Sequence, residues 1–66
     1  MPELAKRPRY QVGDKLQLKD APRWIGTVTD AYGTYNPDGD VLYRVRVPLD
    51  PEPLYMVLTE DEVEKV

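Results

Sequence analysis

The 66-residue sequence contains no cysteine, histidine, serine or phenylalanine. The absence of cysteine excludes disulfides and thiolate metal sites, and the absence of histidine excludes the usual zinc constellations. The side chains that most often act as nucleophiles or acid–base groups at neutral pH are therefore missing. We expect a protein that is not an enzyme and has no cofactor or metal, and whose stability comes from apolar burial alone.

Long apolar runs are missing as well. No stretch approaches the ~20 residues needed to cross a bilayer, and the first nine residues lack the apolar block of a secretory signal. We therefore expect a cytoplasmic protein with no membrane association. A chain of this length buries only about 60% of the surface that its unfolded form exposes, which predicts one domain with a thin core.

Charge is uneven along the sequence. The net charge is −3; residues 1–33 hold six basic and four acidic side chains, whereas residues 34–66 hold three basic and eight acidic ones. An overall negative charge argues against a general nucleic-acid coat protein, because such proteins bind by neutralising phosphates. In a small sheet the two halves interleave in space, so this asymmetry does not by itself predict a charged patch.

Strand-forming residues gather in four runs, at 15–19, 25–32, 41–47 and 54–58. Alternation with a period of two predicts which side chains in these runs face the core. The expected inward residues are Leu16, Leu18, Val28, Tyr43, Val45 and Val47. The same alternation turns Leu42, Arg44 and Arg46 to the opposite face of the third run.

Proline and glycine separate these runs. Residues 20–23 and the proline-rich residues 48–53 predict loops, and residues 33–40 predict an exposed hairpin tip. Thr59 and Glu62 match a capping signal, which predicts a single 3₁₀ turn before a short last strand containing Val63. The chain should therefore form an all-β, five-stranded SH3-like barrel over residues 10–66, preceded by a flexible arm over residues 1–9.

Acidic residues at Asp38 and Asp40, and at 60–64, are explained by the hairpin tip and the capped turn, so we assign no metal-binding or catalytic residue. Aromatic and basic side chains beside loops or on the outward face are better candidates for binding a partner, since such residues bind extended peptides or stack on bases. The aromatic ones could instead cover a barrel mouth. The candidate partner contacts are Arg23, Trp24, Tyr32, Tyr35, Arg44 and Arg46.

Five short segments follow the order of those in a known family: residues 12–19 (VGDKLQLK), 22–24 (PRW), 26–28 (GTV), 42–47 (LYRVRV) and 60–64 (EDEVE). In these segments the chain resembles the C-terminal domain of the nitrile hydratase β subunit, in the SH3-like group called electron-transport accessory proteins. Photosystem I reaction-centre subunit IV and the variable chain of ferredoxin-thioredoxin reductase are similar to it too. The resemblance covers residues 10–66, without the long helical part of the β subunit.

This resemblance implies an accessory domain that docks on a larger metallo- or redox enzyme or complex, whose metal centre belongs to another chain. The docking segments would be residues 20–24 and 33–40. The alternative is a nucleic-acid or ribosome-associated barrel that binds phosphates through Lys6, Arg7, Arg9, Lys15, Lys19, Arg23, Arg44 and Arg46. Residual strand edges would also allow pairing between copies of the chain.

Overall fold

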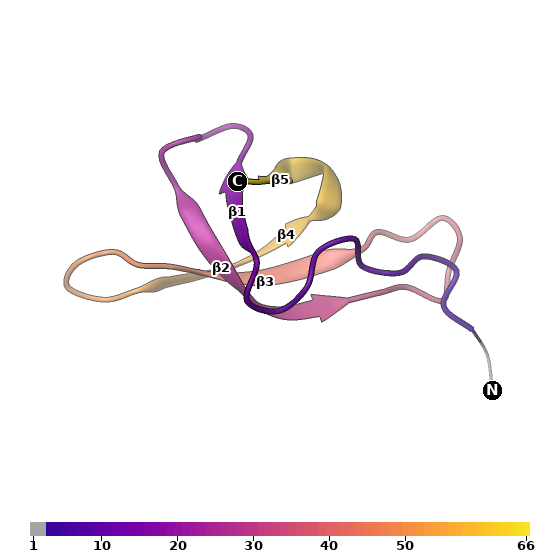
Figure 1. Ribbon diagram of the computed structural model, residues 1–66. Coiled ribbons are helices and arrows are strands. Elements are labelled where there is room, and N and C mark those ends of the chain that lie inside the picture. The colour runs from indigo at the N-terminus through magenta and orange to yellow at the C-terminus, as the bar shows by residue number, and fades with distance from the viewer. Residues whose placement is uncertain (1–2) are drawn as a thin grey trace.

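The computed structural model describes residues 3–66 and consists of one antiparallel sheet with a single helical turn (Figure 1). The elements are β1 (Lys15–Leu18), β2 (Ile25–Tyr32), β3 (Leu42–Val47), β4 (Leu54–Thr59), the 3₁₀ turn η1 (Glu60–Glu62) and β5 (Val63–Lys65). The strands lie in the order β4-β3-β2-β1-β5. The all-β class, the five strands and the 3₁₀ turn before the last strand are confirmed. Among the described residues, no helical segment has the length and apolar character that a membrane crossing requires.

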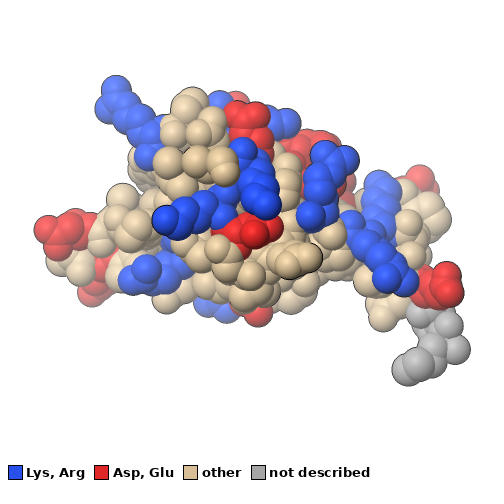
Figure 2. Space-filling model, in the orientation of Figure 1, with Lys and Arg blue, Asp and Glu red and all other residues tan. Residues whose placement is uncertain are grey.

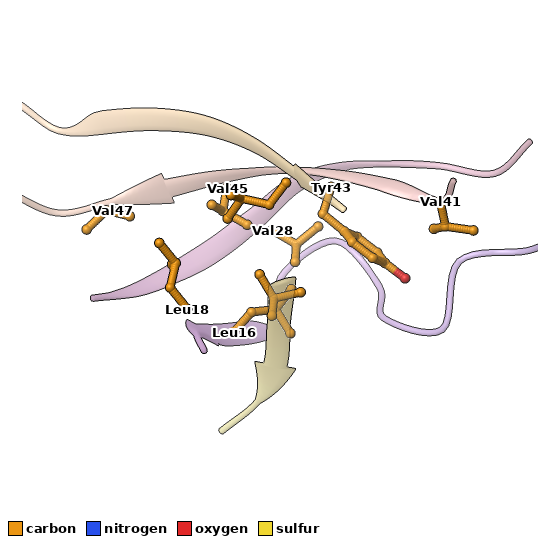
Figure 3. Close-up of a cluster of buried hydrophobic side chains, with 9 residues drawn as sticks. Leu16, Leu18, Val28, Val41, Tyr43, Val45 and Val47 are labelled. Carbon is orange, nitrogen blue, oxygen red and sulfur yellow. The ribbon is translucent and has the colours of Figure 1, made fainter. Parts of the chain in front are cut away.

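The core lies inside the curl of this sheet. Its buried side chains include all six residues expected to face inward, together with Val41, Leu58 and Val63. In Figure 3 Val28 of β2 lies close to Leu16 of β1, and the Tyr43 ring of β3 is directed away from Leu18. Gly26 faces this layer, where an added Cβ would come within 3.1 Å of the Val45 side chain, so the core leaves little room for a larger residue there.

The sheet does not close into a barrel, so that part of the expectation is wrong. β4 and β5 end the sheet on opposite sides, and β5 pairs only with β1. The last strand has three residues, and all of them are used in pairing with β1. A bulge between Val28 and Asp30 adds local twist, which lets the sheet curl around the core while its two edges remain separate.

The N-terminal segment lies beside the tip of the β2–β3 hairpin (Figure 1). The amides of Ala5 and Lys6 donate to the Thr34 carbonyl, and the Thr34 amide donates back to Lys6. Gly33 is needed at this crossing, since a Cβ there would lie 2.7 Å from the Lys6 carbonyl oxygen. Residues 1 and 2 of the expected arm lie outside the described residues.

Candidate functional site

One surface of β2, β3 and β4 faces away from the core, and we call it the outer face. Cross-strand partners in an antiparallel sheet point to the same side, so the register identifies its members. They are Thr27, Asp30 and Tyr32 of β2, Leu42, Arg44 and Arg46 of β3, and Tyr55, Val57 and Thr59 of β4. Three strands therefore present a continuous set of side chains that the core does not use.

Aromatic and aliphatic groups on the outer face are open to solvent. Tyr32 is 47% exposed, Tyr55 50% and Val57 59%, and Leu42 between them is half-buried. Single exposed apolar side chains are normal on any protein. Here Tyr55 and Val57 are two residues apart on β4, and Tyr32 lies opposite Leu42. The outer face therefore combines apolar area with a rigid backbone.

Two arginines complete the outer face. The Arg44 guanidinium lies 5.2 Å from the centroid of the Tyr55 ring, in cation–π geometry. Arg44 also lies opposite Asp30 in the register, whereas Arg46 lies opposite Thr27 and Tyr55. Neither arginine forms an ion pair within residues 3–66, where the salt bridges are Arg9–Glu60 and Lys65–Asp14. Both guanidinium groups thus keep donors for a partner.

The predicted contact residues do not form one cluster. Tyr32, Arg44 and Arg46 share the outer face, and Tyr35 lies in the exposed hairpin tip just beyond it. Arg23 and Trp24 lie in the β1–β2 loop, at the other end of β2. An eight-residue strand spans roughly 25 Å, so this loop and the Tyr32 end of the outer face cannot contact the same small epitope.

Sequence reasoning placed Leu42 on the same face as Arg44 and Arg46 but missed Tyr55 and Val57 as members of the outer face. The signal was present in β4, whose sequence LYMVLT is apolar at nearly every position. A half-buried strand normally alternates apolar and polar residues, so β4 alone does not show which of its sides is exposed. The pairing of Val57 with Arg44 and of Tyr55 with Arg46 places these two residues on the outer face.

A polar cluster apart from the outer face joins the core to the N-terminal segment. The Tyr43 hydroxyl donates to Glu60 Oε2 at 2.6 Å and accepts from the Arg9 and Tyr10 amides at 2.8 and 3.2 Å. Burial, and then the hydrogen bond to the Glu60 carboxylate, raise the pKa of Tyr43 above its ordinary value. None of the buried side-chain polar atoms among the described residues lacks a partner, and the Tyr10 ring packs at 5.4 Å from the Tyr43 ring. This cluster has a structural role.

Basic residues elsewhere on the chain do not form one patch with the outer face. Lys6 donates to the Gly39 carbonyl, and Arg9 pairs with Glu60. Figure 2 shows Lys and Arg side chains interspersed with Asp and Glu across the visible face. The eight residues of the nucleic-acid hypothesis are therefore distributed over the arm, β1, the β1–β2 loop and β3.

Comparison of the chain with protein families, with curated proteins and with solved structures finds no match.

Proposed function

We propose that this protein is a non-catalytic protein-interaction domain that docks on a larger partner through its outer face. The observation that supports the proposal is the exposed set of Tyr32, Tyr55 and Val57 beside Arg44 and Arg46, all on one side of three paired strands. Tyrosine and arginine are enriched at protein interfaces and at their energetic hot spots. A partner that covers these residues gains apolar burial and charge-assisted hydrogen bonds together.

The backbone of the outer face needs little ordering on binding. Its nine side chains come from regular strands and not from loops, and rigid contact surfaces lose less conformational entropy when they dock. Arg44 is held over the Tyr55 ring, so part of its side-chain entropy is already lost in the free protein. Acidic groups on the partner are the natural counterparts of the two guanidinium groups.

The class of partner follows from the resemblance to the electron-transport accessory group. In those families, as the resemblance implies, the domain attaches to a metallo- or redox enzyme or complex. The partner is accordingly a larger enzyme or complex whose reactive centre belongs to its own chain. The domain shapes or shields that centre without supplying a catalytic group.

Nucleic-acid binding is the second candidate function, favoured by one observation. Arg44 and Arg46 flank the exposed Tyr55 ring on a sheet face, and this combination can stack on bases while it contacts phosphates. The net charge of −3 disfavours binding that depends on phosphate neutralisation. Protein docking is therefore the primary proposal.

Site-specific photo-crosslinking in cells of the source organism tests the two functions. Tyr32 is replaced with a benzoylphenylalanine residue, which keeps an aromatic side chain on the outer face. The matched control places the same group at Trp24, an exposed aromatic residue in the β1–β2 loop at the other end of β2. The expected result is a discrete adduct from position 32, degraded by protease, resistant to nuclease and absent when Arg44→Ala is added.

Two outcomes contradict this proposal. An adduct from position 24 with none from position 32 would assign docking to the β1–β2 loop. A nuclease-sensitive adduct from position 32, with affinity for mixed RNA that increases as salt falls, would assign the outer face to nucleic acid. The mass of an adduct also shows whether it joins two copies of this chain, because two crosslinked copies have twice the 7.6 kDa of one.

A further inference from the structure

β4 forms an unprotected edge of the sheet. It pairs with β3 on one side, and no strand within residues 3–66 pairs with its other side. Its six residues, LYMVLT, contain no charge, proline or glycine. An apolar, uninterrupted edge strand is a template for pairing with another chain.

Alternate residues of β4 form backbone hydrogen bonds to β3, and the remaining residues present their backbone groups on the free edge. The Glu60 amide donates to the Val41 carbonyl, and every second residue of an antiparallel ladder bonds toward its neighbour. Residues 54, 56 and 58 therefore bond to β3, whereas Tyr55, Val57 and Thr59 direct their N–H and C=O groups away from it. The Thr59 amide confirms this alternation, since it donates at 3.0 Å to the Glu62 carboxylate and not to β3.

The opposite edge of the sheet, formed by β5, is protected against strand addition, unlike the β4 edge. β5 has three residues, of which Glu64 and Lys65 are charged and exposed, and the Glu64 carboxylate accepts a hydrogen bond from the Gln17 side chain. A short and charged edge is one of the ways in which proteins prevent strand addition. The chain protects one edge in this way and leaves the β4 edge without any such feature.

We propose that the β4 edge pairs with the β4 edge of a second copy of this chain, antiparallel and about a two-fold axis at Met56. Tyr55 and Val57 of one copy then exchange backbone hydrogen bonds with Val57 and Tyr55 of the other. On the outer face, each exposed Tyr55 ring lies beside the exposed Val57 of the second copy, an aromatic and β-branched pair that stabilises sheets. On the inner face, Leu54, which is 37% exposed, lies beside Leu58.

The ends of β4 favour this register. Continuing the pairing outward would place Pro53 opposite Thr59 of the second copy. Proline has no N–H to donate, and the Thr59 N–H is already bonded to Glu62. The edge therefore offers hydrogen bonds only at its centre, symmetrically around Met56. Because β4 contains no charge, pairing of identical strands places no like charges opposite each other within it.

This proposal goes beyond the docking function and does not depend on it. Two copies joined at β4 would form one continuous sheet with both outer faces on the same side. A single pair of six-residue strands buries less surface than a standard stable interface, so the dimer should form at high micromolar to millimolar concentration and dissociate on dilution.

Sedimentation equilibrium of the full chain tests the proposal. The weight-average mass should rise from 7.6 kDa at low micromolar concentration toward twice that value at millimolar concentration. Val57→Pro should keep the protein monomeric, because it removes an N–H that points away from β3 and an edge strand tolerates such a proline. Val57→Lys should do the same by placing a charge at the edge.

Val12→Lys is the matched control. It makes the same change at a position that is 66% exposed and outside every strand, and it should dimerise as the unchanged chain does. Circular dichroism verifies that each variant is folded, and Val57→Lys gives a second test if the proline variant does not fold. A chain that stays monomeric at millimolar concentration overturns the proposal. So does a dimer whose dissociation constant is equal in the Val57→Lys and Val12→Lys variants.

Discussion

Tyr43 is a single residue that joins the core of the sheet to the N-terminal segment and η1. Its ring is completely buried in the core, while its hydroxyl reaches the N-terminal segment and η1. In Figure 3 the hydroxyl oxygen points away from Leu16, Val28 and Val45. A buried tyrosine is stable only when its hydroxyl finds a partner, and Glu60 and the Arg9 amide supply such partners from distant parts of the sequence.

Removing this hydroxyl tests its importance. Tyr43→Phe keeps the ring but leaves Glu60 and the Arg9 and Tyr10 amides without a shared partner. Loss of hydrogen bonds that include one to a charged group should lower the free energy of unfolding by about 1–3 kcal/mol. Urea denaturation measures the change. Tyr35→Phe, at an exposed position in the hairpin tip, should leave the midpoint unchanged, and equal effects of the two variants would contradict the assigned role.

The raised pKa of Tyr43 predicts a loss of stability at alkaline pH. Burial and the Glu60 carboxylate favour the neutral phenol in the folded state, so the unfolded state loses the proton first as pH rises. The contribution is complete below the ordinary pKa of 10.0 and is lost as pH rises through the folded-state pKa. The melting temperature should fall more steeply above pH 10 in the unchanged chain than in Tyr43→Phe. Parallel curves for the two proteins would exclude this linkage.

At the scale of elements, the contact between the N-terminal segment and the β2–β3 hairpin depends on a glycine. A Cβ at Gly33 would lie 2.7 Å from the Lys6 carbonyl oxygen and 2.8 Å from Leu4. Both distances are too short, so either the segment or the hairpin has to move. The segment moves more easily, because it is attached to the sheet through a few hydrogen bonds near Thr34.

Gly33→Ala should therefore release the N-terminal segment and leave the sheet intact. We expect trypsin to cleave after Lys6 several-fold faster than in the unchanged chain, because proteolysis follows local opening. Cleavage after Arg44, inside β3, should keep its rate. Tyr35→Ala alters the same hairpin tip without adding a Cβ at the crossing and serves as the control. Equal acceleration at both bonds would show that the substitution unfolds the whole domain.

Secondary structure was predictable from sequence because its signals are local. The limits of β2 match the expected residues 25–32, and those of β1, β3 and β4 differ by one residue each. Proline and glycine set these limits, and alternation identified the inward residues of β1 and β3. The outer face was only partly predictable. Arg44 and Arg46 follow from alternation within β3, but Tyr55 and Val57 follow from their pairing with β3, and β4 itself has no polar side to orient it.

At the scale of the whole molecule, closure of the sheet could not be predicted from local pattern. Closure depends on the lengths of the strands at the two ends, on the twist at the Val28–Asp30 bulge and on which edges meet. A sequence of five short strands is compatible with an open sheet and with a closed one. The open result leaves β4 as an edge, which is why the outer face and the edge are both available for contact.

Residue-by-residue amide hydrogen exchange at low micromolar concentration tests most directly the claim that the sheet ends at β4 with a free edge. The amides of Met56 and Leu58, which bond to β3, should exchange slowly. The amides of Tyr55 and Val57, which point away from β3, should exchange at rates close to those of unstructured peptides. Slow exchange of all four amides under these conditions would show that another segment covers the edge, and would contradict an open sheet that ends at β4.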